Sequence, residues 1–202
     1  KSKLNGMIQK LRESSEKSIG LAPNEFDRFN ILNCITNLEM FHKQLKEIKI
    51  KMKDLLEQIE YWSLLKSING IGIVTSATFL GELGDPSNFK SPKEIIKFAG
   101  LDPREKSSGK YKGKTKISKK GRYLMRTMIY FMSMRLVHRD EGFKAYYEYK
   151  LKTRNKYGRY IEKREALMAV GIKLIKVIFA MFRDNKKYEG LKYKEIFLLK
   201  TA

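Results

Sequence analysis

The sequence predicts an all-α protein in which a long coiled-coil helical arm precedes a compact helical domain. Three observations lead to this prediction: a heptad pattern of apolar residues over 25–66, further helical periodicity between 123 and 184, and an apolar content of 42% in 202 residues, enough for one core. We expect a short helix and loop at 1–24, the arm at 25–66, the compact domain at 67–184 and a basic tail at 185–202.

The predicted arm, capped by Asn24, carries apolar side chains at alternating steps of three and four residues. This spacing is the a/d seam of a coiled coil, sustained over about four heptads without proline or glycine. One amphipathic helix lying on its own domain is the alternative, but the strict period favours a partner helix, either in the same chain or in another subunit. Of these two we expect a homo-oligomer. The seam consists of Ile31, Cys34, Leu38, Phe41, Leu45, Ile48, Met52, Leu55, Ile59 and Trp62.

The charge of the chain indicates its class of partner. Lys and Arg total 43 against 22 Asp and Glu, which gives a formal net charge of +21. Such an excess attracts a polyanion, most commonly nucleic acid. An anionic membrane surface is the competitor, but no segment approaches the roughly 18 apolar residues that span a bilayer. The basic residues also lie in a loop and not beside an apolar helix face, so we expect no membrane partner.

Other features of the composition exclude several kinds of site. The N-terminus lacks the apolar segment of a signal peptide, and the single cysteine, Cys34, rules out an internal disulfide and a cysteine-built zinc site. We therefore expect a reducing cytoplasm. The acidic residues are scattered, so we expect no metal site in this chain. The sequence begins with Lys1 and not with Met, which suggests a fragment of a longer protein.

Residues 68–72, with the sequence I-N-G-I-G, join two helical patterns. Glycines at this spacing let the backbone approach a phosphate without a Cβ in the way, and the following helix offers unpaired N–H groups and the positive end of its dipole. We interpret the stretch as a helix-hairpin-helix motif in which Gly70, Gly72 and Thr75 hold a phosphate. An ordinary corner between two helices is the alternative.

The segment 101–122 is dense in lysine and is predicted to be mostly loop, with room for a brief strand pair around 111–117. Between 104 and 126 its only acidic residue is Glu105. Because like charges repel, a cluster of one sign is costly without a counter-charge, which favours nucleic-acid binding over a disordered basic linker. The residues predicted to bind are Lys110, Lys112, Lys114, Lys116, Lys119, Lys120, Arg122 and Arg126.

The same loop contains the triplet Ser107-Ser108-Gly109. A serine in a cationic, glycine-flanked loop can attack a phosphodiester while nearby Lys and Arg stabilise the developing charge. Most such triplets are simple turns, and both histidines lie far away in sequence. The residues by themselves leave both interpretations open.

The order of these motifs resembles the C-terminal domain of insertion-sequence 110/116-type transposases. The matching motifs run from Leu65 to Arg126: L-x-x-I-x-G-I-G, F-K-S-x-x-x-I-x-x-F-A-G-L-x-P, S-S-G-K and I-S-K-K-G-R-x-L-x-R. The resemblance implies a DNA recombinase that is guided by a structured RNA. It also implies a serine that links covalently to DNA during strand exchange, and this serine corresponds to Ser108, with Ser107 as the neighbouring alternative.

The family also implies an N-terminal RuvC-like domain whose acidic residues bind Mg²⁺, and nothing in this chain resembles it. We therefore expect a C-terminal fragment that binds double-stranded DNA and guide RNA, that does not recombine DNA alone, and that resides at the nucleoid in a prokaryotic cytoplasm. The alternative is a non-catalytic helix-hairpin-helix module that binds nucleic acid and in which Ser108 is only a turn residue.

Overall fold

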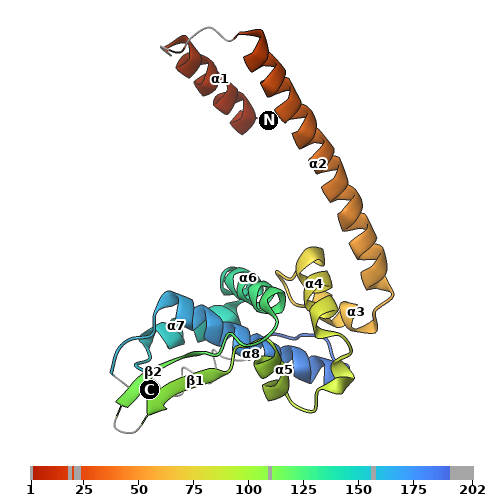
Figure 1. The fold of residues 1–202 in the computed structure, drawn as a ribbon. Helices are drawn as coiled ribbons and strands as arrows, with labels where there is room; N and C mark the ends of the chain where they lie inside the picture. Colours follow the sequence, from red (N-terminus) through yellow and green to blue (C-terminus); the bar gives the residue numbers. More distant parts are fainter. Residues whose placement is uncertain (1, 18–19, 21–23, 109–110, 156–157, 192–202) are drawn as a thin grey trace. The chain divides into compact units, whose positions relative to one another are not determined.

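The structure is a computed structural model, shown in Figure 1, and it describes residues 2–17, 20, 24–108, 111–155 and 158–191. For 2–4, 105–108 and 111–116 it describes the backbone alone. The chain divides into two units, Lys1–Glu47 and Ile48–Ala202. Each unit is described by itself below.

The first unit holds helix α1 (Ser2–Glu16) and most of helix α2 (Glu25–Glu57). Asn24 caps α2 as predicted: its side-chain Oδ1 accepts a hydrogen bond from the Asp27 N–H at 2.8 Å, and its own N–H donates to the Asp27 carboxylate at 3.2 Å. The seam residues within this unit are all exposed, and Leu38, for example, is 58% exposed. These apolar side chains therefore have no partner within the described part of this unit.

The heptad pattern predicted one helix through residue 66, and this prediction is wrong at its C-terminal end. Helix α2 ends at Glu57, and a separate helix α3 (Glu60–Lys66) follows after an extended Ile59. The reason is burial: Leu56 is 1% exposed and Trp62 8% exposed, both in the core of the second unit. Burying these side chains outweighs continuing a straight helix.

The second unit is built mainly of helices, which confirms the all-α prediction. Helix α8 packs against α3, α5, α6 and α7, and Figure 1 shows these helices around it. At the crossing of α6 and α8, a Cβ on Gly171 would lie 2.6 Å from Cγ2 of Ile129, so glycine permits the close contact. The remaining helices are α4 (Ile73–Leu83), α5 (Pro92–Phe98), α6 (Tyr123–Arg139), α7 (Glu141–Lys152), α8 (Lys163–Asp184) and the 3₁₀ turn η1 (Pro86–Asn88).

The segment predicted to be mostly loop forms an antiparallel hairpin of β1 (Pro103–Ser108) and β2 (Tyr111–Ile117). Its base is closed at Asp102, whose carbonyl accepts the Ser118 N–H at 2.8 Å and whose carboxylate accepts the Ser118 hydroxyl. The register contains an irregularity between Glu105 and Ser107. The paired residues are Pro103 with Ile117, Arg104 with Lys116, Glu105 with Thr115, Ser107 with Lys112 and Ser108 with Tyr111.

Candidate nucleic-acid interface

The glycine turn between α3 and α4 lies directly against helix α6. Gly70 has a φ of 105°, a conformation that side-chain-bearing residues rarely adopt. A Cβ at this position would lie 3.3 Å from Cδ of Arg139 and 3.6 Å from Cβ of Arg135. Glycine is therefore required here both for the backbone conformation and for the close approach to α6.

The turn satisfies much of its own hydrogen bonding. The Gly72 N–H donates to the Thr75 hydroxyl at 3.1 Å, and this hydroxyl donates back to the Gly72 carbonyl at 2.9 Å. The Ile71 N–H donates to the Ile68 carbonyl at 3.2 Å. Thr75 is also only 4% exposed. The three residues predicted to hold a phosphate do meet in one turn, but the Gly72 amide and the Thr75 hydroxyl already bind each other.

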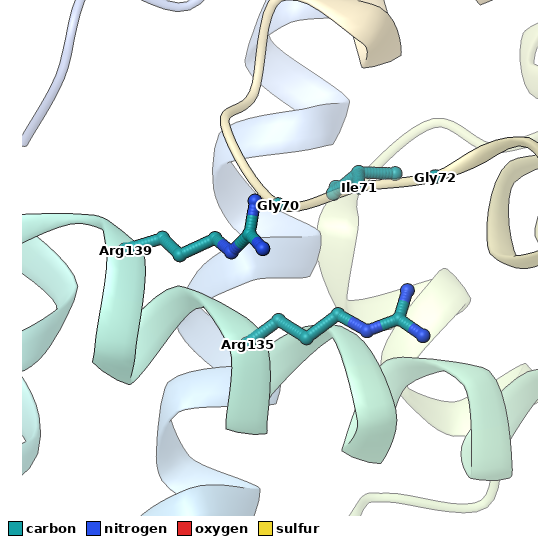
Figure 2. A pocket seen from close by; sticks show the side chains of 5 residues that line it. All are labelled: Gly70, Ile71, Gly72, Arg135 and Arg139. Atoms are coloured by element: carbon teal, nitrogen blue, oxygen red, sulfur yellow. The ribbon is translucent and has the colours of Figure 1, made fainter. Parts of the chain in front are cut away.

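Two arginines outside the predicted motifs lie beside the turn. Gly70, Ile71 and Gly72 line a shallow hollow of about 250 Å³ together with Arg135 and Arg139. Figure 2 shows both side chains reaching from α6 toward the turn, with the Arg139 guanidinium beside Gly70. The sequence does show two arginines four residues apart on a helix without acidic residues. Only the fold shows that they lie beside the glycine turn.

A basic strap, defined here as residues 118–122, crosses the C-terminal end of α5. The Lys119 N–H donates to the Gly100 carbonyl at 3.0 Å, and the Arg122 N–H donates to the Phe98 carbonyl at 3.0 Å. A Cβ on Gly121 would lie 2.3 Å from the Phe98 oxygen. The strap thus fixes its backbone on α5 and leaves Lys119 and Lys120, two of the predicted binding residues, exposed to solvent.

Two other predicted binding residues contact the protein itself. Arg126 donates from Nη1 to the Ala99 carbonyl at 2.9 Å, and its guanidinium lies 5.7 Å from the Tyr123 ring centre. Arg122 lies 5.5 Å from the Phe98 ring centre. Arg126 therefore ties α6 to the end of α5, whatever else it binds.

The hairpin carries the remaining candidates. The backbone of Ser107 lies opposite Lys112, and that of Ser108 opposite Tyr111. Lys114 and Lys116 follow in β2. Lys110 lies outside the described residues. In the described part of the chain, no group of three or more His, Cys, Asp or Glu is placed to hold a metal ion, and no helix there combines the length and apolarity needed to cross a membrane.

Comparison with known proteins identifies the domain that holds these features. Residues 62–148 match the sequence model of the transposase IS116/IS110/IS902 family. The chain carries a domain of this transposase family. The recognition made from the motifs between 65 and 126 is therefore confirmed. The glycine turn, the hairpin, the strap and both arginines of α6 all lie within the transposase domain.

Individual relatives agree with this assignment. A 43.6 kDa protein of insertion element IS110 from Streptomyces coelicolor is 27% identical over 155 residues, which are 77% of this chain and 37% of that protein. The transposase of IS1111A from Coxiella burnetii is 28% identical over 57% of this chain and 31% of its own length. The pilin gene-inverting protein of Moraxella bovis is 29% identical over 63% and 38%. The chain thus spans about a third of these transposase-related proteins.

Proposed function

We propose that this chain is the C-terminal part of an RNA-guided insertion-sequence transposase, in which it binds double-stranded DNA and guide RNA and supplies a serine nucleophile. Membership of residues 62–148 in the transposase family supports the role in DNA transposition. The net charge of +21 supports binding to the nucleic-acid backbone. In this proposal the protein works at the nucleoid in the cytoplasm.

The observation that carries the serine assignment is the pairing of β1 with β2. It places Ser107 and Ser108 at the last two positions of β1, opposite Lys112 and Tyr111 in a lysine-rich strand. In the proposed step the Ser108 oxygen forms a bond to phosphorus and a deoxyribose oxygen leaves. Positive charge from the neighbouring lysines stabilises the extra negative charge of the transition state. Mg²⁺ belongs, in this proposal, to a RuvC-like domain outside this chain.

The exposed seam of α2 supports assembly through a coiled coil. Ile31, Leu38 and Leu45 are all exposed at a positions of the heptad. Contiguous apolar surface of this kind favours a partner helix, and we propose a second copy of this chain as that partner. Leu38→Asp with Leu45→Asp should lower the mass measured by light scattering, whereas Lys43→Asp on the outer face should not. An unchanged mass for the seam variant would contradict this assembly.

The serine assignment is tested in the whole transposase, with its upstream domain present. Ser108→Ala should abolish strand exchange and the covalent protein–DNA product, while binding of DNA in a gel-shift assay remains. Ser107→Ala is the matched control, and it should leave the covalent product intact. If strand exchange is retained in both single variants and in Ser107→Ala/Ser108→Ala, the chain acts as a binding module. If only Ser107→Ala loses the covalent product, Ser107 is the nucleophile.

A further inference from the structure

We propose that Arg135 and Arg139 form a seat for a phosphodiester group of the nucleic-acid backbone against the Gly70–Gly72 turn. The inference deepens the proposed function, because it assumes that the chain binds nucleic acid, and it names the groups that do so at this turn. Both side chains come from α6 and line the same hollow as the turn. Figure 2 shows them side by side along the helix, below Gly70 and Gly72.

Two amides of the turn are already bound within it. The Ile71 N–H donates to the Ile68 carbonyl, and the Gly72 N–H donates to the Thr75 hydroxyl, so neither is available to an anion. The two guanidiniums add donors at the same hollow. Each offers a planar set of N–H groups that matches phosphate oxygens in pairs.

The two guanidiniums have no counter-charge among the described residues. The side chains of Arg135 and Arg139 make no hydrogen bond and no ion pair with any of these residues. The next residue in sequence, Asp140, points its carboxylate elsewhere: one oxygen accepts the Phe143 N–H at 2.8 Å and the other accepts the Tyr188 hydroxyl at 2.8 Å.

The spacing of the two arginines carries an energetic cost, because like charges four residues apart on a helix repel and weaken it. The chain nevertheless keeps two arginines at this spacing beside a turn whose Gly70 permits contact with both stems. A bound phosphate removes the repulsion and gives the glycine a role beyond turning the chain.

The size of the hollow limits the ligand. About 250 Å³ is smaller than the roughly 300–1,000 Å³ typical of pockets that enclose an organic ligand. The five lining residues include no aromatic ring on which a base could stack. The site therefore fits a phosphate group of a polymer that continues over the surface, and not an enclosed nucleotide.

The test compares affinity and salt dependence for the 202-residue chain and its variants, with duplex DNA and an RNA hairpin of equal phosphate number as probes. Arg135→Gln/Arg139→Gln should weaken binding about tenfold or more at low salt. It should also reduce the slope of log affinity against log salt by about 0.9 for each duplex phosphate that the variant no longer neutralises. If the glutamine variant binds only one of the two polymers more weakly, the phosphate belongs to that polymer. If it binds both more weakly, DNA and RNA share the seat.

Two matched variants distinguish binding at this seat from a general effect of positive charge on affinity. Arg183→Gln/Lys187→Gln removes the same charge where Arg183 is already paired with Asp184 at 2.7 Å, and should weaken binding far less. Arg135→Lys/Arg139→Lys keeps the charge but not the paired geometry, and should show a nearly unchanged slope with reduced affinity. Urea unfolding of every variant should stay cooperative and show no marked loss of stability relative to the unmodified chain, which shows that the fold is intact.

Two results overturn the inference. If the glutamine pair in α6 binds as tightly as the unmodified chain, or no more weakly than the control pair, the seat does not exist although the proposed function stands. If the unmodified chain itself binds neither DNA nor RNA at low salt, the proposed function fails, and this inference fails with it.

Discussion

Two pairs of arginines, each spaced by four residues, lie at the two ends of helix α6. The first pair contacts other parts of the protein, and the second faces solvent at a hollow. At the N-terminal end, Arg122 and Arg126 lie against aromatic rings, and Arg126 donates to the Ala99 carbonyl. At the C-terminal end, Arg135 and Arg139 face a shallow hollow and pair with no described residue. Equal charge near one helix thus has two different environments: the first pair contacts the protein itself, and we propose that the second binds a ligand.

The largest expected effect concerns the strap that the first pair adjoins. Gly121→Ala introduces a Cβ at 2.3 Å from the Phe98 oxygen and 2.6 Å from the Gly100 nitrogen, both of which are backbone atoms. We expect the free energy of unfolding to fall by about 3 kcal/mol, as measured by urea denaturation. Gly81→Ala in α4, where a Cβ meets nothing within 4 Å, is the control. It should raise stability by roughly 0.5–1 kcal/mol.

A direct comparison of the two pairs is the next prediction. Arg126→Ala leaves the Ala99 carbonyl without its donor and removes the contact with Tyr123. It should reduce the free energy of unfolding by about 1–2 kcal/mol. Arg139→Ala should change it by less than about 0.5 kcal/mol. Equal reductions in the two variants, both measured in urea, would erase the distinction between the pairs.

The pH dependence of stability provides a subtler test of the strap. The hydrogen bond from Ser118, with a smaller contribution from Arg104, holds the pKa of Asp102 below its ordinary value of 3.8. A depressed pKa in the folded state means that the stabilisation is complete above about pH 4 and disappears as pH falls below it. Ser118→Ala should therefore flatten the fall in unfolding free energy below about pH 4, measured in urea. A fall as steep as in the unmodified chain would contradict this role of Ser118.

The smallest expected effect is on the second pair in the absence of nucleic acid. Arg135→Gln relieves the repulsion between charges four residues apart and should raise the free energy of unfolding by about 0.2–0.5 kcal/mol. The gain, followed by urea denaturation, should shrink as salt screens the charges. A decrease in stability would mean that Arg135, like Arg126, has a structural partner.

The sequence predicted the helices well where periodicity and capping agree. Asn24 caps α2 as expected, and α8 (Lys163–Asp184) lies within the helical periodicity predicted between 123 and 184. The same periodicity failed at Trp62, because a heptad pattern does not say whether an apolar residue faces a partner helix or its own core. The sequence predicted mostly loop where the structure has a hairpin, because lysine-rich strands lack the usual alternation of apolar residues.

The candidate site was predicted in part for a similar reason. The glycine turn is local in sequence, so Gly70, Gly72 and Thr75 were found together. Arg135 and Arg139 follow about 60 residues or more later, and no local pattern links them to the turn. Nor does sequence show that the Gly72 amide is already bonded within the turn, because this depends on the Thr75 rotamer.

The most direct test of the distinction between the two pairs is to follow the arginine Nε–H signals by ¹⁵N NMR while duplex DNA is added. Signals of Arg135 and Arg139 should shift, because the charged groups take up a phosphate, while the Arg126 signal, held by Ala99, should stay in place. Shifts at Arg126 with unchanged signals from Arg135 and Arg139 would contradict the account.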